Sequence, residues 1–282
     1  MVGGDSLRRP ALRPGWYPGA AREVKELLDS WSADLRCLQA KAAVSPHAGW
    51  HYSGRMAAKA LASLGPCDTI AIVGGHLGPS DPLLCAPETR FQTVGAVIEA
   101  DTELREALFA ELREQGFPPL AQDDEADNSV EVLLPLVAAL HPGSKVLWLR
   151  CPPRPEAKEL GAALGRASAI LGIRTACVGS TDLTHYGRAY GFSPMGLGPE
   201  AETWVRKVND KAFVDSLLAM DSEACLATSR KKACSCSAGA AAAAIGFALE
   251  TGATEARLLE YGTSLDTIRA ESFVGYVAIA FC

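Results

Sequence analysis

The chain of 282 residues is 48% hydrophobic and 21% charged, a composition typical of a globular protein that buries one large core. Its net charge is −6 and it has no basic block, so nucleic acid is excluded as an expected partner. The longest apolar stretch, residues 238–249, is broken by two glycines and is shorter than the roughly 20 residues of a membrane span, so we expect no membrane association.

The cysteines and the N-terminus both favour a cytoplasmic protein. The nine cysteines are an odd number, and most lie in apolar surroundings, which is typical of reduced thiols in a core. Arg8 and Arg9 lie near the N-terminus, but no apolar run follows them. We therefore predict no signal peptide and a cytoplasmic location.

In the first half of the chain, helical and strand patterns alternate. Residues 23–38 space their apolar side chains like an amphipathic helix, and residues 41–45 predict a short buried strand that Pro46 ends. The pattern continues with a helix at 52–64, a strand at 68–73 that ends in Gly74 and Gly75, and helices at 102–114 and 129–140.

The second half of the chain continues the same alternation. It predicts a strand at 145–149, a helix at 155–171, a strand at 174–179, one or two helices within 203–220, a helix of small residues at 238–251, and strands at 258–261 and 273–281. Short apolar strands between helices indicate a sheet that is covered on both faces. We predict a single α/β domain over residues 1–282, with a central mixed or parallel sheet flanked by helices.

Three of the five histidines follow predicted strands within a few residues. His47 follows the strand at 41–45, His76 follows the strand at 68–73, and His185 follows the strand at 174–179. Ligands of open α/β sheets bind at the carboxyl ends of the strands, so these three imidazoles are expected to converge at one edge. Glycines at the turns, such as Gly49 and Gly75, permit a close approach of the backbone to a small ligand.

Two further residue types complete the candidate site. Asp182 lies three residues before His185 and could hold an imidazole N–H, which would fix the tautomer of the ring. Cys234 and Cys236 lie just before the small-residue helix, where a thiolate is favoured and could bind a metal. Zinc-ribbon, H-E-x-x-H, dinucleotide and phosphate-loop motifs are absent from the sequence.

The order of these motifs resembles that of the Memo family along nearly the whole chain. The resemblance rests on RPALRPGWYPGAAREVKELLDSW, VSPHAGWHYSG, VGGHLGP, DDEADNSVEVLLPLV, VGSTDLTHYG and CSAGAAAAA. It implies a fold similar to that of class III extradiol dioxygenases, which bind Fe(II) with two histidines and a carboxylate. Memo proteins have a cysteine in place of that carboxylate. Carried over by motif, His47, His76 and Cys236 become metal ligands, and His185 becomes the acid/base of the pocket, with Asp182 beside it.

The sequence departs from the family pattern at four places. Gly74 and Gly75 replace the family's Gly-Pro-Asn/Ser before His76, and Asn128 replaces the histidine of a Glu-His-Ser motif. His51 is an additional imidazole. Cys234 and Cys236 compete for the ligand position, and the sequence C-S-A-G-A after Cys236 favours that residue.

The resemblance suggests three functions. The first is a non-haem Fe(II) enzyme that acts with O2 on a small, possibly aromatic substrate. Copper and zinc are the alternatives to iron, because two histidines and a thiolate also suit those metals. The second function is a scaffold or metal-binding protein without turnover, such as one that recognises phosphotyrosine peptides. The third is a component of a bacterial modification system that works with a radical-SAM protein. A retained His185–Asp182 pair favours the enzyme.

Overall fold

The computed structural model describes residues 6–282 of the chain. Its strands are β1 Leu7–Arg8, β2 Ala42–Ser45, β3 Thr69–Gly74, β4 Leu84–Cys85, β5 Arg90–Thr93, β6 Ala96–Glu99, β7 Ala121–Gln122, β8 Lys145–Arg150, β9 Thr175–Ser180, β10 His185–Tyr186, β11 Ala256–Thr263 and β12 Phe273–Phe281. Its α-helices are α1 Ala21–Trp31, α2 Trp50–Ala62, α3 Thr102–Glu114, α4 Asn128–Glu131, α5 Leu134–Leu140, α6 Glu156–Leu171, α7 Pro199–Trp204, α8 Asp210–Leu218, α9 Ser222–Lys232 and α10 Ala238–Glu250. A π-helical turn, Val205–Asn209, joins α7 to α8.

Within the described residues, nine strands form one mixed sheet. Its order is β10-β12-β2-β9-β3-β8-β4-β7, and β11 pairs with β12 outside this path. The strands β2, β9, β3 and β8 are parallel, whereas β12 and β4 join on either side in the antiparallel direction. The strands β1, β5 and β6 form a separate three-stranded sheet. This arrangement confirms the predicted α/β fold with a central mixed sheet.

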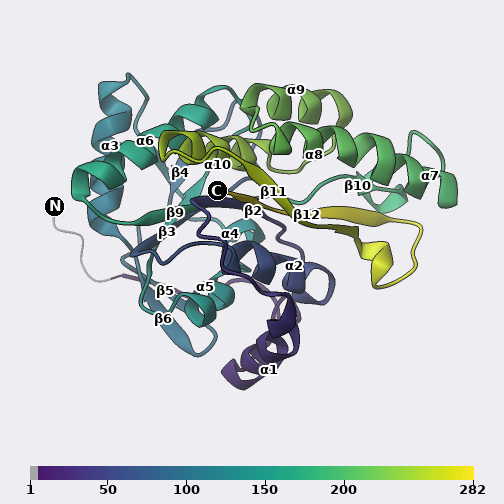
Figure 1. Cartoon of the computed structure of the whole chain (residues 1–282), viewed down its shortest axis with the longest axis horizontal. Coiled ribbons are helices and arrows are strands. Elements are labelled where there is room, and N and C mark those ends of the chain that lie inside the picture. The colour runs from purple at the N-terminus through teal and green to yellow at the C-terminus, as the bar shows by residue number, and fades with distance from the viewer. Residues whose placement is uncertain (1–5) are drawn as a thin grey trace.

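Helices cover both faces of the central sheet. Figure 1 shows α3, α6, α8, α9 and α10 on one side of it and α1, α2, α4 and α5 on the other. Alternate residues of a strand point to opposite faces, so the sheet separates two cores. In β3, Ala71 and Val73 belong to the core under α6 and α10, whereas Ile70 and Ile72 belong to the core under α2 and α5.

The small-residue helix α10 packs against α6 at very close range. A Cβ atom at Gly161 of α6 would lie 1.9 Å from the carbonyl oxygen of Ala243 in α10, so only glycine allows this approach. All residues of α10 from Ala238 to Ala248 are buried. The helix is therefore an interior element of the fold, and in the described residues no helix is both long and apolar enough to cross a membrane.

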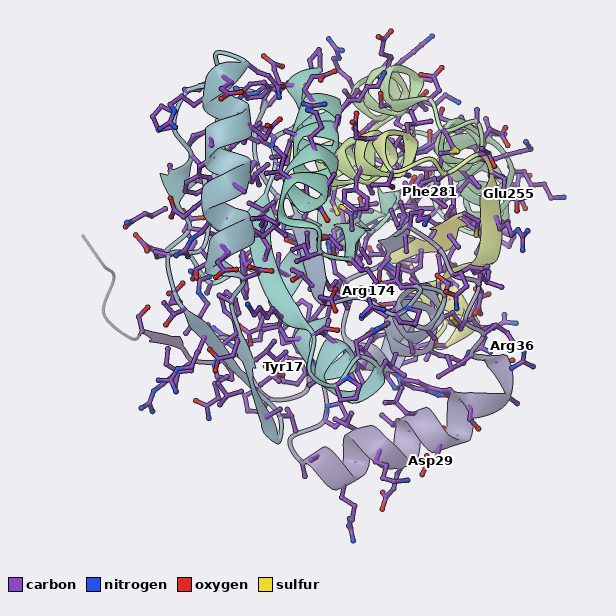
Figure 2. The ribbon with its side chains drawn as sticks, turned by 60° about the vertical axis from the view of Figure 1, so that its left-hand side comes forward. Tyr17, Asp29, Arg36, Arg174, Glu255 and Phe281 are labelled. Atoms are coloured by element: carbon purple, nitrogen blue, oxygen red, sulfur yellow. The ribbon has the colours of Figure 1, made fainter. Side chains whose placement is uncertain are left out.

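The structure corrects several predicted boundaries. The helix predicted at 129–140 is interrupted between α4 and α5, because Pro135 has no N–H to continue a helix and is tolerated only in a first turn. The helix predicted at 23–38 ends at Trp31, followed by the 3₁₀ turn Ser32–Asp34. Figure 2 shows α1 at the edge of the molecule, with Asp29 on its exposed side.

Candidate metal centre

Three neighbouring parallel strands deliver the candidate residues to one edge of the sheet. Strand β2 ends at Ser45, two residues before His47, and β3 ends at Gly74, two residues before His76. Strand β9 lies between β2 and β3 and ends at Ser180, two residues before Asp182. Because parallel strands end at the same edge, the loops that follow them meet there.

The side chains of His47, His76 and Cys236 converge at this edge. The Nε2 atoms of the two histidines are 3.1 Å apart, and the Sγ atom of Cys236 is 3.3 Å from Nε2 of His47. The three donor atoms all lie within 4.8 Å of one another. Among the described residues, they form the one group of histidine, cysteine or carboxylate side chains arranged to hold a metal ion.

The turn that carries His76 has an unusual backbone. His76 has a φ of +58°, in the left-handed region of backbone conformation that residues other than glycine rarely adopt. Immediately before it, a Cβ atom at Gly75 would lie 2.3 Å from Oγ of Ser237. The glycine therefore lets the Cys236 loop approach the His76 turn closely enough for the sulfur and the imidazole to meet.

Each histidine is held by its other ring nitrogen. Nδ1 of His47 lies 2.9 Å from Oγ of Ser180, and Nδ1 of His76 donates a hydrogen bond of 2.8 Å to the carboxylate of Asp127. Both Nε2 atoms are thereby directed at the shared centre. This pattern, in which a ring N–H is bound by a neighbour, is typical of metal-ligating histidines.

The three donor groups form an ionic cluster. Burial raises the pKa of the Cys236 thiol, but the adjoining His47 and His76 rings outweigh it and bring the pKa well below its ordinary value. Burial lowers the pKa of His76, yet the hydrogen bond to Asp127 and the Cys236 sulfur raise it to about 10. These shifts favour the thiolate form of Cys236, and a bound cation could take the place of the protons on the Nε2 atoms of the two rings.

The other residues considered from the sequence lie elsewhere. Cys234 is fully buried in the core with the α10 residues, so its sulfur is not part of the cluster. His51 is exposed on α2, and Nε2 of His141 lies 2.9 Å from the carbonyl oxygen of Leu61. The structure therefore places Cys236 rather than Cys234 beside the two histidines.

Asp182 has a different contact from the one expected. Its Oδ1 atom accepts the backbone N–H of His47 at 2.8 Å, and its Oδ2 atom lies 3.9 Å from Nε2 of the same residue. Nδ1 of His185 instead lies 3.1 Å from the carbonyl oxygen of Leu183. The structure therefore does not place Asp182 on Nδ1 of His185, the contact expected from the sequence, because its carboxylate lies against the loop that follows β2.

A cavity of about 430 Å³ adjoins the convergence point. His47, His76, Asp182 and His185 all lie on its wall, together with the aromatic residues Trp16, Tyr52, Tyr190 and Tyr276. The rings of His185 and Tyr190 meet edge to face, with their centroids 5.0 Å apart. The predicted common location of the three histidines is thus a single pocket with an aromatic wall.

The short helix α4 supplies polar contacts that the sequence reasoning did not identify. Asp127 at its N-terminus holds His76, and Nδ2 of Asn128 donates to the carbonyl oxygen of His47 at 3.0 Å. Oγ of Ser129 accepts the N–H of Gly75 at 3.1 Å. The resemblance of DDEADNSVEVLLPLV to the Glu-His-Ser motif was the available signal for this element, but spacing alone did not show what each residue binds.

Glu131, the last residue of α4, binds the N-terminal segment. Its carboxylate accepts the N–H groups of Ala11 and Leu12, at 2.9 and 3.0 Å, and the hydroxyl of Tyr17 at 2.7 Å. Tyr17 is labelled in Figure 2. This attachment positions the adjoining Trp16, whose carbonyl oxygen accepts the N–H of Trp50 and which lies on the wall of the cavity.

The fold occurs in a solved structure of distant sequence. The crystal structure of the uncharacterized protein JW3007 from Escherichia coli K12 aligns with a TM-score of 0.55 at 14% identity, over 86% of this chain and 99% of the other. At that identity the likeness concerns the fold alone.

Sequence comparisons identify relatives over nearly the full length. The chain is 31% identical to the MEMO1 family protein TK1477 of Thermococcus kodakarensis, covering 98% of this chain and 99% of the relative. It is 29% identical to a MEMO1 family protein of Archaeoglobus fulgidus, with 98% and 99% covered. Both relatives are archaeal, which does not support the bacterial setting that the sequence suggested. A family model described as Memo-like protein matches residues 8–280, and the chain belongs to the Memo family.

Proposed function

We propose that this Memo-family chain is a metal-dependent protein of the dioxygenase type, which holds Fe(II) through His47, His76 and Cys236. The observation that carries the proposal is the convergence of two imidazole nitrogens and one sulfur within 4.8 Å of one another. Three donors that bind one ion at about 2.0–2.3 Å have separations of this size. A thiolate and two imidazoles whose Nδ1 atoms are occupied fit a divalent cation at the point they share.

The adjoining cavity supports a small substrate. Its volume of about 430 Å³ lies within the range of ligand pockets, and its aromatic side chains suit a flat, partly apolar molecule. Three protein ligands would leave open positions on an iron ion, and when bound that ion would supply a site where O2 and a substrate oxygen meet. Trp16, Tyr52, Tyr190 and Tyr276 would orient the substrate toward it.

His185 is the residue proposed to move a proton. It lies on the wall of the cavity, outside the three-residue cluster, and its Nδ1 atom is occupied by the carbonyl oxygen of Leu183. This contact leaves Nε2 available to take the proton of a substrate hydroxyl. Asp182, whose buried carboxyl group accepts the backbone N–H of His47, would hold the His47 loop rather than orient His185.

Two variants test this division of roles. His47→Ala deletes a proposed ligand, so the protein purified without O2 should lose its metal. His185→Ala should keep its metal content and lose turnover by about 10²–10⁴-fold, the usual contribution of a general base. Metal analysis and O2 uptake with a panel of catechols measure both effects. His51→Ala, which changes an exposed imidazole on α2, is the matched control and should alter neither quantity.

The outcomes separate the proposed enzyme from its alternatives. If metal analysis finds copper or zinc in place of iron, the identity of the proposed metal would be wrong, while the three proposed ligands would stand. No O2 uptake by the metal-loaded protein, across the whole panel, would contradict the enzyme and favour a metal-binding scaffold. Equal metal loss in the two variants would make His185 a ligand. A requirement for a radical-SAM protein before any activity appears would identify the chain as one part of a longer system.

A further inference from the structure

The two histidines of the centre are held by different kinds of partner. His47 is fixed by a neutral group, the hydroxyl of Ser180. His76 is fixed by the carboxylate of Asp127, which in turn contacts the guanidinium of Arg150, with Nη2 of Arg150 3.4 Å from Oδ2 of Asp127. The His76 side chain is also the more exposed of the two, at 31% against 1% for His47. The Nδ1 atom, which faces away from the centre, therefore has a neutral partner in His47 and a carboxylate partner in the more exposed His76.

Arg150 contacts both the backbone and the side-chain partner of His76. It ends β8, where it pairs with Gly74 of β3, and its own side chain is only 3% exposed. Its Nε atom donates to the carbonyl oxygen of Gly75 at 3.0 Å, and Nη1 lies 3.1 Å from Oδ1 of Asp123. One buried guanidinium thus fixes the residue before His76 and the carboxylate that binds the His76 ring.

The orientation of the Asp127 side chain is itself fixed by hydrogen bonds. Its Oδ1 atom accepts the N–H of Ser129 at 2.8 Å, as a helix N-cap, and also the hydroxyl of Ser129. This leaves Oδ2 for the His76 ring. Because a carboxylate can only accept, Nδ1 of a neutral His76 must carry the proton and Nε2 must present its lone pair to the centre.

We propose that Asp127 and Arg150 are positioning residues that fix His76, on its left-handed backbone, with Nε2 as a metal donor. The inference rests on the metal centre of the proposed function. Asp127, the N-cap of α4, and the buried Arg150 would thus each have a role at the centre, although neither takes part in a step of the proposed reaction.

Asp127→Asn is the sharpest test because it replaces one carboxylate oxygen by an NH₂ group and reverses one hydrogen bond. An asparagine can keep its oxygen on Ser129 and remain an N-cap, which places its amide N–H₂ opposite Nδ1 of His76. That nitrogen must then accept, so the ring proton moves to Nε2, the atom needed by the metal. We expect zinc(II) and cobalt(II) to bind about 10–100-fold more weakly, the usual effect of removing such a partner.

Two companion variants distinguish positioning from general damage. Asp127→Glu keeps the carboxylate and should recover part of the affinity. Glu125 also contacts Arg150, with Oε2 3.1 Å from Nη1, but its side chain is 74% exposed, so Glu125→Gln should bind zinc like the wild type. Arg150→Lys keeps the charge but cannot reach Gly75 and Asp127 together, so it should weaken binding even where Asp127→Asn fails to fold.

The readouts are dissociation constants from competition with a chelating dye, and ¹⁵N NMR of the histidine rings in the zinc-loaded protein. The wild type should show His76 protonated at Nδ1. Zinc binding by Asp127→Asn within twofold of the wild type would overturn the positioning role while leaving the metal centre intact. A wild type that binds neither zinc nor cobalt would overturn the metal centre and this inference together.

Discussion

Asp210 is a carboxyl group that the fold buries completely at the start of α8. It accepts hydrogen bonds from the N–H and hydroxyl of Thr184 and, at 2.8 Å, from the hydroxyl of Tyr261. Burial raises its pKa to about 6, although these donors oppose the shift. The residue thereby anchors the segment between Asp182 and His185 while remaining costly to ionise.

The sign of this shift makes the stability of the protein depend on pH. The folded state holds the Asp210 proton more tightly than the unfolded chain does. The stabilisation that this proton contributes is therefore fully present below about pH 4, the pKa in the unfolded chain, and is lost as the pH rises through about 6, the pKa in the folded protein. The loss amounts to about 3 kcal/mol, from roughly two pKa units at 1.36 kcal/mol each. Asp210→Asn should flatten this part of the profile, as measured by urea unfolding between pH 4 and 7.

The exposed Asp215 on the same helix provides the control. It pairs with Lys211, and Asp215→Asn should leave the slope between pH 4 and 6 as in the wild type. An unchanged slope in Asp210→Asn would show that another group carries the titration.

Residues of the site differ in how far the sequence could place them. His47 and His76 follow recognisable strands, and parallel strands require their loops to meet, so their convergence was predictable. The contacts of Asp182, Asp127 and Arg150 were not, because each depends on the direction of a side chain within a turn or on a partner more than 20 residues away. Spacing in a sequence carries no information of that kind.

At the scale of elements, the contact between α6 and α10 shows how a glycine can determine packing. Alanine stabilises a helix by about 1 kcal/mol relative to glycine where space allows. Gly161 has no such space, since its Cβ would meet the backbone oxygen of Ala243 at 1.9 Å. Gly161→Ala should therefore separate the helices and lower the free energy of unfolding by about 1–3 kcal/mol, as overpacking does. Denaturant unfolding measures the change.

Gly165 of the same helix is the matched control. A Cβ there would lie 2.8 Å from Cγ and 3.2 Å from Cβ of Glu250, so that exposed residue would have to shift, but the nearest atoms belong to side chains and not to the backbone. Gly165→Ala should cost less than Gly161→Ala, because the helix propensity of alanine, about 1 kcal/mol above that of glycine, offsets part of the shift of Glu250. A similar loss in both variants would show that the α6–α10 distance is not what the glycine protects.

Elements that the sequence did not reveal share a physical reason. The strands β4, β7 and β10 have two residues each, too few for an alternating pattern to appear. Helix α9 buries only Ser222, Cys225 and Leu226, so its apolar face is too narrow to stand out. The strands β3, β8 and β12 and the helix α10 were predictable because nearly all of their residues are buried and apolar.

For the whole molecule, a metal that binds the folded chain must stabilise it. The three ligand atoms come from the loop after β2, the turn after β3 and the segment before α10, and the unfolded chain does not bring them together. At 100 times its dissociation constant the ion adds about 2.7 kcal/mol. With about 2–4 °C for each kcal/mol in large domains, we expect a rise in Tm of about 5–10 °C.

Differential scanning calorimetry with and without cobalt(II) measures this rise. His47→Ala should abolish it, whereas His51→Ala should keep it. An equal rise in His47→Ala would mean that the ion acts at some other place on the surface.

The attachment of the N-terminal segment to Glu131 has a consequence for its local unfolding. The N–H groups of Ala11 and Leu12 and the hydroxyl of Tyr17 all bind one carboxylate, so a movement of that carboxylate releases all three together. The segment should therefore open as one cooperative unit, and its amides should exchange with deuterium at a common rate. Each opening would carry Trp16 away from the cavity. The rate of local unfolding of the N-terminal segment would therefore also determine how often one wall of the pocket is exposed to bulk water.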